Sequence, residues 1–254
     1  MVQAHTQVIP ALPAQTFPRL LLQHAQSRAQ QAAYREKDLG IWQTWNWSQV
    51  LLEVRALACG LAAIGFQRGM NLAIIGDNRP RLYWAMLAAQ VLGGVPVPLY
   101  QDAPAVDMRY VLENAEIAFA VAEDQEQVDK LLDVASNYSH LAHIAYDNER
   151  GMRHYQQSGV LSLHDLQTQG RAFDAANPEF FQQQIELGQA SDIALILYTS
   201  GTTGKPKGVC QTHASLMAAG AGGVSFDQLT QHEEVLSYLP MAWVGDSLFS
   251  FAQA

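Results

Sequence analysis

The feature that most constrains the fold is an alternation of apolar runs and amphipathic stretches between residues 71 and 146. The apolar runs contain almost no charged residues, which is typical of strands buried on both faces of a parallel sheet. Strands are predicted at 71–75, 95–99, 117–121 and 142–146, and the helices that join them at 80–92, 105–115 and 125–136. Because such alternation builds mostly parallel sheets flanked by helices, the predicted fold class is α/β.

A helix, a short hairpin and a longer helix are predicted ahead of this alternation. Thr16 is a candidate N-cap because Pro18 follows inside the first turn. Ser48 is the candidate N-cap of the longer helix, whose apolar residues recur at helical spacing up to Ile64. The predicted bounds are 16–31 for the first helix and 33–35 and 41–46 for the strands. Three tryptophans are expected to pack the hairpin onto a helix rather than to bind a ligand: Trp42, Trp45 and Trp47.

The remaining segments carry weaker patterns. Residues 147–192 are polar and predict a connector with one helix, at 179–187. A strand is predicted at Val235–Leu239, and Asp246 or Ser247 is expected to cap a final helix. After the first strand of the alternation, Gly76-Asp77-Asn78 stands where doubly wound folds bind ligands, but an N-cap role for Asn78 is the simpler interpretation.

The strongest functional signal is the loop that follows the apolar run 193–198. No side chain larger than threonine occurs between Thr199 and Gly204, so backbone N–H groups can approach a ligand closely. Lys205 and Lys207 follow, and no Asp or Glu occurs from 193 to 226 although the chain has 24 acids against 15 Lys plus Arg. A donor-rich, locally cationic loop favours a polyphosphate ligand. On composition alone, the alternative is an ordinary Gly/Thr-rich surface turn.

Two common phosphate motifs do not fit this loop. The Walker pattern requires Gly at position 199 and Ser or Thr at position 206, which are Thr199 and Pro206 here. Pro206 also disfavours a helix starting on Lys205. Residues 209–212 instead predict a return strand, with a helix at 213–221 behind it. The loop is therefore expected at the tip of a strand–loop–strand hairpin.

The order of residues in the loop points to a family. The segment Tyr198–Gly208, YTSGTTGKPKG, resembles the phosphate-loop signature of the adenylate-forming superfamily, which includes acyl-CoA synthetases, nonribosomal adenylation domains and luciferases. Three further segments, 44–48, 92–99 and 239–243, resemble other core motifs of that superfamily in the expected order. The segment 33–47 most resembles the long-chain fatty acyl-CoA ligase branch. Together these motifs extend over nearly the whole chain.

The resemblance implies ATP-dependent activation of a carboxylic acid, long-chain fatty by expectation, to acyl-AMP and then to acyl-CoA, with ATP, Mg²⁺ and CoA required. The residues implied to contact the ATP phosphates are Thr199, Ser200, Gly201, Thr202, Thr203, Gly204, Lys205 and Lys207, with Lys205 a variable position. Thr202 is also implied to lie near the Mg²⁺ that accompanies ATP. Trp243, Val244 and Gly245 are implied to line the acyl pocket. Many relatives have His at the position of Trp243, so this indole is expected to act as a steric gate.

The same resemblance predicts a fragment. The superfamily's adenine and ribose motifs, its hinge and its C-terminal catalytic lysine have no match here, so no catalytic residue is assigned. The predicted organisation is a loose arm at 1–15, a first α/β subdomain at 16–189, a truncated second subdomain at 190–254, and no C-terminal lid domain. Alternatives are an acyl-AMP ligase, an aromatic or short-chain acyl-CoA ligase and, in another class, a non-catalytic nucleotide-binding module.

Composition narrows partners and compartment. The net charge of −9 argues against nucleic acid as a partner. Cys59 and Cys210 are expected to be buried thiols in a reducing cytoplasm, and no transmembrane segment is predicted. Peripheral membrane contact fits a fatty acid substrate, and the oligomeric state is not predicted. His140 and His143 lack an evident third ligand, so a metal site is not expected there.

Overall fold

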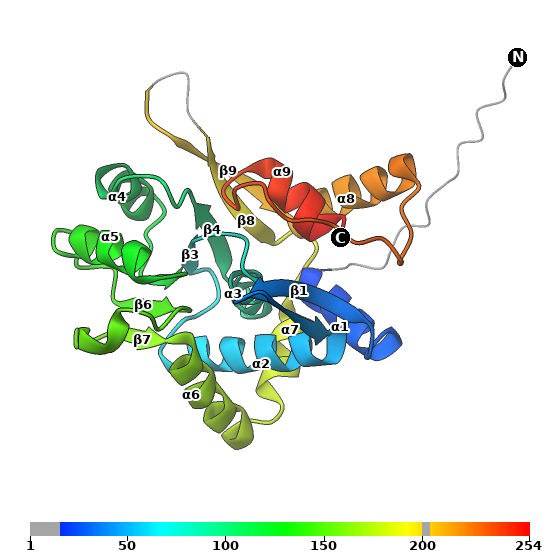
Figure 1. Ribbon diagram of the computed structural model, residues 1–254, viewed down its shortest axis with the longest axis horizontal. Coiled ribbons are helices and arrows are strands. Elements are labelled where there is room, and N and C mark those ends of the chain that lie inside the picture. Colours follow the sequence, from blue (N-terminus) through cyan, green and yellow to red (C-terminus); the bar gives the residue numbers. More distant parts are fainter. Residues whose placement is uncertain (1–15, 200–203) are drawn as a thin grey trace, which may run out of the picture.

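A parallel sheet of five strands forms the centre of the molecule. The computed structural model describes residues 16–199 and 204–254. The strands are β3 (Asn71–Ile75), β4 (Val95–Leu99), β5 (Phe119–Ala122), β6 (His143–Tyr146) and β7 (Val160–Ser162), in the spatial order β4-β3-β5-β6-β7 (Figure 1). All pairings are parallel. The four strands predicted for the alternation are confirmed, and β7 was missed because three residues leave too little pattern.

Helices cover both faces of this sheet, which confirms the α/β fold class. The helices of one core cluster are α1 (Phe17–Ser27), α2 (Trp47–Ala63), α3 (Pro80–Val91), α6 (Leu163–Ala176) and α7 (Phe180–Leu187). Those of the other are α4 (Ala105–Asn114) and α5 (Gln125–Ala135). On β3, Leu72 and Ile74 enter the first cluster whereas Ala73 and Ile75 enter the second. The strand is apolar throughout because both of its faces are buried.

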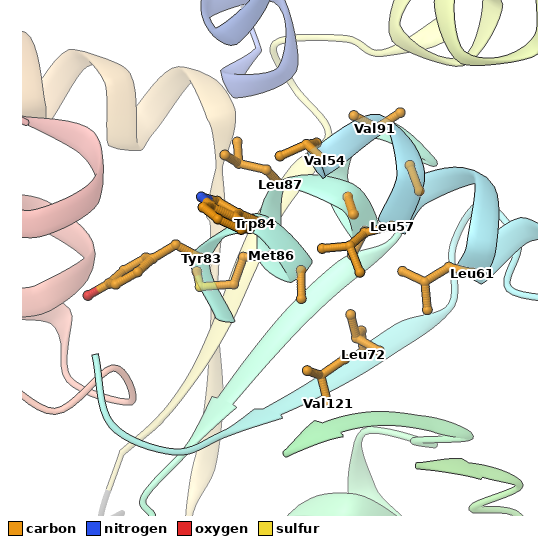
Figure 2. Packing of buried hydrophobic residues seen from close by; sticks show 14 of the residues in the cluster. Val54, Leu57, Leu61, Leu72, Tyr83, Trp84, Met86, Leu87, Val91 and Val121 are labelled. Atoms are coloured by element: carbon orange, nitrogen blue, oxygen red, sulfur yellow. The ribbon is translucent and has the colours of Figure 1, made fainter. Parts of the chain in front are cut away.

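Every residue of helix α3 except Arg81 is buried, and the helix connects the core to a polar cluster outside it. Figure 2 shows Leu57 and Leu61 of α2 packing near Leu72 of β3, with Trp84 of α3 in the same cluster. The ring of Tyr83 lies at the edge of this cluster, and its hydroxyl points toward the helical segment near the end of the chain. Tyr83 thus has an apolar ring in the core and a polar end outside it.

The predicted N-terminal hairpin is confirmed as β1 (Ala32–Asp38) and β2 (Ile41–Asn46), which pair antiparallel. Its tryptophans behave differently from one another. Trp45 packs edge-on against Trp84 of α3 with ring centroids 5.3 Å apart, as expected. Trp47 packs on His24, with ring centroids 4.6 Å apart. The packing prediction is wrong for Trp42, which is exposed beside Lys37.

Helix caps were only partly predictable. Thr16 caps α1, as expected, by accepting a hydrogen bond from the Arg19 N–H. Ser48 does not cap α2: Asn46 does, because its side chain and that of Gln49 form a reciprocal capping box. Asn78 does not cap α3, which begins after Arg79 without a side-chain cap bond. The side-chain amide of Asn78 makes its hydrogen bonds elsewhere, with partners that include Asp246.

The predicted connector 147–192 is more structured than its polar composition indicates. It contains the short turn η1 (Met152–His154), strand β7 and the whole of α6. Helix α6 was missed because close backbone contact replaces a broad apolar stripe: a Cβ on Gly170 would lie 1.9 Å from the carbonyl oxygen of Ala56 in α2. The predicted helix at 179–187 is confirmed as α7.

The C-terminal part begins with the predicted hairpin, β8 (Ile193–Thr199) and β9 (Lys207–Thr212), followed by α8 (His213–Asp227). Thr212 caps α8 through a reciprocal capping box with Ser215. The strand predicted at 235–239 is wrong: these residues are irregular. The final helical turns are α9 (Val244–Asp246) and η2 (Ser247–Ala252). Neither Asp246 nor Ser247 makes a capping bond; the carboxylate of Asp246 binds Tyr83 instead.

The two predicted subdomains share one apolar cluster. Ala194 and Leu195 of β8 and Met241 belong to the same cluster as Leu57 and Trp84. The boundary at residue 190 stays a prediction, as does the loose arm at 1–15, which lies outside the described residues. No helix within 16–199 and 204–254 combines the length and apolarity needed to cross a membrane.

Candidate functional site

The β8–β9 hairpin is fixed at its base and open toward its tip. Strand β8 lies against β4, and the side-chain N–H of Gln90 in α3 donates to the carbonyl oxygen of Ala194 at 2.8 Å. Further along β8, the Tyr198 hydroxyl donates to Oδ1 of Asn114 at the end of α4, at 2.6 Å. Figure 1 shows strands β8 and β9 extending away from the body of the molecule toward Thr199 and Lys207. The sheet and its helices therefore hold the base of the hairpin and leave these two residues exposed.

The loop residues described by the structure are accessible. Thr199 and Lys207 face each other across the two strands, and both are exposed, as are Gly204 and Lys205. Gly204 has φ of 87°, a left-handed conformation that favours glycine. Ser200, Gly201, Thr202 and Thr203, predicted to contact phosphates, lie outside the described residues, so their assignment stays a prediction.

The two lysines of this loop are not neutralised. Eight ion pairs join described residues, and none includes Lys205 or Lys207. The ammonium of Lys205 lies 5.3 Å from the centre of the Tyr110 ring, a cation–π contact that leaves its charge in place. With no acid between 193 and 226, the loop can accept a polyanion without first breaking an ion pair.

A buried histidine connects this hairpin to the N-terminal helix. His213 follows β9 directly and is 3% exposed. Its Nδ1 accepts the backbone N–H of Phe17 at 3.3 Å, which requires the neutral ring. Burial lowers the pKa of His213 to about 4, with a smaller opposing effect from Asp192. No local pattern indicates this role, because the partner is 196 positions away.

The residues predicted to line the acyl pocket lie in another segment. Trp243 and Val244 are exposed, by 51% and 53% respectively, and Gly245 is partly buried. They lead into η2, which packs against α8. An exposed indole on an irregular segment is available for an apolar ligand, but no described contact joins Trp243 to the loop lysines. The pairing of the two sets in one active site therefore stays a prediction.

Sequence reasoning missed a buried polar cluster beside Trp243. Asp246 is 1% exposed, and its carboxylate accepts hydrogen bonds from Tyr83, Asn78 and Ser237. Burial raises the pKa of Asp246, and the hydrogen bonds that it accepts, led by that from Tyr83, lower it. Burial and then the charge of Asp246 raise the pKa of Tyr83. The sequence feature that could have indicated this cluster is a single acidic residue, Asp246, within the mostly apolar run 239–252.

The crevice where doubly wound sheets bind ligands is filled by the protein itself. The strand order places this crevice at the carboxyl ends of β3 and β5. There, Nε of Arg79 lies 2.6 Å from the carboxylate of Glu123, which also accepts the Asp77 N–H at 2.6 Å. A second ion pair joins Arg79 to Glu36 of β1 at 3.1 Å. These contacts leave the hairpin as the candidate phosphate site.

Other candidate sites carry no support in the described parts of the chain. No group of three or more His, Cys, Asp or Glu side chains there could hold a metal ion. His143 stacks on Phe119, with ring centroids 4.8 Å apart, as a packing residue would. Cys59 is buried as predicted, but the prediction is wrong for Cys210, which is exposed on β9.

Comparison with known proteins identifies the family. Residues 21–252 match the family of AMP-binding enzymes. The chain belongs to this family. Its curated relatives include a long-chain-fatty-acid–CoA ligase of Homo sapiens, ACSBG2, 27% identical over 230 residues, which are 90% of this chain and 34% of the relative. FadD15 of Mycobacterium bovis, also named a long-chain-fatty-acid–CoA ligase, is 27% identical over 229 residues, 89% of this chain and 36% of the relative. This AMP-binding chain thus spans about a third of their length.

Solved structures confirm the fold. A putative long-chain-fatty-acid CoA ligase from Rhodopseudomonas palustris matches 94% of this AMP-binding chain and 55% of its own, with a TM-score of 0.74 and 18% identity. An anthranilate CoA ligase in complex with anthranoyl-AMP matches 84% of this chain and 38% of its own, with a TM-score of 0.70 and 21% identity. The superfamily and fold expectations from the sequence are therefore confirmed.

Proposed function

We propose that this AMP-binding chain contributes the triphosphate site of an acid–CoA ligase, which activates a carboxylic acid with ATP to acyl-AMP and then forms acyl-CoA. The single observation that carries the proposal is a pair of exposed lysines, Lys205 and Lys207, which have no acidic partner among the described residues and stand on a hairpin anchored at its base. Family membership supports adenylation as the reaction. The phosphate-contacting set is Thr199 to Lys205 together with Lys207.

The chemistry follows from charge. A carboxylate is already ionised at pH 7, so attack on the α-phosphorus of ATP requires no general base. The new bond joins the carboxylate oxygen to the α-phosphorus while the bond to the β-phosphate oxygen breaks and pyrophosphate leaves. Negative charge builds on the leaving group, and Lys207 with the backbone N–H groups of the loop would stabilise it. In the second step the CoA thiol replaces AMP on the acyl carbon.

Magnesium is assigned to the nucleotide rather than to this part of the chain. The described residues offer no acidic cluster for a divalent cation, and Thr202, the one hydroxyl proposed near it, is not described. Mg²⁺ prefers oxygen ligands and often keeps phosphate oxygens among them. Bound in that way, it would reduce the charge that the incoming carboxylate meets.

A long-chain fatty acid is the substrate class proposed first. The curated relatives named above carry that activity in their names, and Trp243 and Val244 present exposed apolar side chains that could contact an acyl chain. Aromatic acids are the second candidate, because the solved anthranilate ligase shares this fold. A cytoplasmic enzyme that contacts membranes only at their surface would fit the first class.

The test is pyrophosphate release by the full-length protein with ATP, Mg²⁺ and a panel of acids that spans fatty acids of different lengths and benzoic acids, with and without CoA. Preferred turnover of long-chain acids, with CoA-dependent thioester formation, is the expected result. Replacing both Thr202 and Lys207 by alanine should abolish measurable ATP binding, whereas Lys37→Ala, an exposed lysine on β1, should not. ATP binding without turnover of any acid would favour a non-catalytic nucleotide-binding module instead.

A further inference from the structure

The segment between α8 and α9 has almost no regular structure, yet its end is held firmly. Residues 228–243 form no helix or strand, and Leu236 and Tyr238 are 79% and 73% exposed. Such a segment is expected to be among the most mobile parts of a protein unless specific contacts hold it. Trp243 lies in this segment, so whatever fixes the segment also fixes the indole.

The strongest of these contacts is the buried carboxylate of Asp246. The Tyr83 hydroxyl lies 2.8 Å from Oδ1 and 2.9 Å from Oδ2 of this carboxylate. Nδ2 of Asn78 lies 2.9 Å from Oδ1. Burying a carboxylate costs free energy unless hydrogen bonds from the protein replace those from water. Here the donors include Asn78 and Tyr83, both at the start of α3.

The same donors also hold the middle of the segment, at Ser237 and Leu239. Nδ2 of Asn78 lies 2.9 Å from the Ser237 hydroxyl and 2.9 Å from the carbonyl oxygen of Leu239. The Ser237 hydroxyl lies 2.7 Å from that of Tyr83 and donates to Asp246 at 3.1 Å. Residues 237 and 246 are thus joined to each other and to the start of α3. These contacts hold the two ends of the intervening loop together, and this loop includes Trp243.

We propose that Asp246, with Asn78 and Tyr83, is a positioning device that holds Trp243 in place and thereby selects which acids the enzyme accepts. The acid-selecting part of this proposal rests on the proposed function, because it takes Trp243 as an acyl contact. Asp246 is a positioning residue rather than a catalytic one. Because Asn78 and Tyr83 lie at the start of α3, they fix the position of the Trp243 indole relative to the five-stranded sheet rather than relative to the hairpin.

The test uses the full-length protein with Asp246→Ala, Asp246→Asn and Tyr83→Phe, beside two controls outside the cluster, Asp133→Ala and Tyr100→Phe, both at exposed positions. Hydrogen exchange is measured for the peptide 229–246, with α6 as an internal reference. Asp246→Ala should raise exchange in 229–246 about tenfold without changing α6. Asp246→Asn should have a smaller effect because its amide retains the shape and part of the hydrogen bonding.

Kinetics provide the readout that a purely structural role would not move. In Asp246→Ala, the KM for the preferred acid should rise about tenfold while the KM for ATP stays within about twofold, and the preference among chain lengths should flatten. Tyr83→Phe should shift the preference in the same direction and Tyr100→Phe should not. Because Tyr83→Phe removes only one oxygen atom, it keeps the test valid if Asp246→Ala does not fold.

The outcomes separate this proposal from the proposed function. Unchanged exchange in 229–246 would overturn the positioning device whatever the kinetics show. Raised exchange with an unaltered acid preference would overturn the selecting role while ATP-dependent turnover remains. A parent enzyme that turns over no acid would overturn the proposed function, and the exchange measurement would still decide whether Asp246 holds the segment.

Discussion

The carboxyl edge of the five-stranded sheet and the tip of the β8–β9 hairpin use their charges in opposite ways. At the sheet edge, Arg79 is paired with both Glu123 and Glu36. At the hairpin, Lys205 and Lys207 have no acidic partner among the described residues. Paired charges hold elements together, whereas unpaired ones remain available to a ligand. Doubly wound folds generally bind ligands at the carboxyl edge of the sheet. In this protein, paired charges at that edge hold structural elements together instead.

Backbone geometry shows the same contrast. Gly76, at the end of β3, has φ of 154°, and a Cβ there would lie 2.4 Å from Cβ of Glu123. Gly204, at the hairpin, also has a positive φ, but a Cβ there would meet nothing within 4 Å. The sheet edge is closed around its own side chains, and the hairpin leaves space where a ligand can approach. Four experiments test this difference.

The largest effect is expected from the two cations themselves. Lys207→Ala in the full-length protein should lower kcat/KM for ATP about a hundredfold, because a cation next to the leaving pyrophosphate is lost. Arg79→Ala should leave the KM for ATP unchanged and reduce the free energy of unfolding by about 1 kcal/mol, since Arg79 is partly exposed. Steady-state kinetics and denaturant unfolding measure the two effects. A loss of stability but not of kcat/KM for ATP in Lys207→Ala, together with a higher KM for ATP in Arg79→Ala, would contradict the proposed difference between the two regions.

Glycine at the sheet edge should be essential for stability. Gly76→Ala should reduce the free energy of unfolding by about 3 kcal/mol, because the added methyl meets Glu123 and the backbone conformation is unfavourable. The matched control is Gly222→Ala in α8, where a Cβ meets nothing within 4 Å. This control should stabilise the protein by about 0.5 kcal/mol through helix propensity. A neutral Gly76→Ala variant would show that the crevice is not closed.

The anchor of the hairpin should make stability depend on pH. The pKa of His213 is about 4 in the folded protein and 6.5 without the fold, so the unfolded chain binds more protons between these values. Stability contributed by the neutral ring is therefore present above pH 6.5 and is lost as the pH falls, by about 2 kcal/mol between pH 7 and pH 5. His213→Gln should remove that loss, as unfolding curves at both pH values would show. Equal slopes for parent and variant would contradict the buried, neutral state.

The smallest effect is expected in the irregular segment. Leu236→Ala should change the free energy of unfolding by less than about 0.5 kcal/mol, because Leu236 is 79% exposed. Leu72→Ala in β3, by contrast, removes a fully buried side chain and should cost about 3 kcal/mol. Thermal unfolding monitored by circular dichroism compares them. A large loss from Leu236→Ala would mean that other parts of the full-length protein cover this segment.

Much of this protein was determined by local sequence. Strands such as 71–75 and 95–99 were predictable because a strand buried on both faces must be apolar throughout. The hairpin, and the prediction that it binds phosphate, followed from small residues, two lysines and the absence of nearby acids. Family membership followed from the order of residues in Tyr198–Gly208, which the match over 21–252 confirmed.

Which polar side chains stabilise the fold, and which stay available to a ligand, depends on the tertiary structure alone. Asn78 looked like a helix cap and Asp246 like another, yet the two bind each other across 168 positions. His213 is neutral because the chain buries it against Phe17, and Arg79 is paired because β1 and β5 bring acids to it. Local patterns encode burial and backbone conformation, since these depend on neighbouring residues. Partners distant in sequence are chosen by packing, so no local pattern could reveal them.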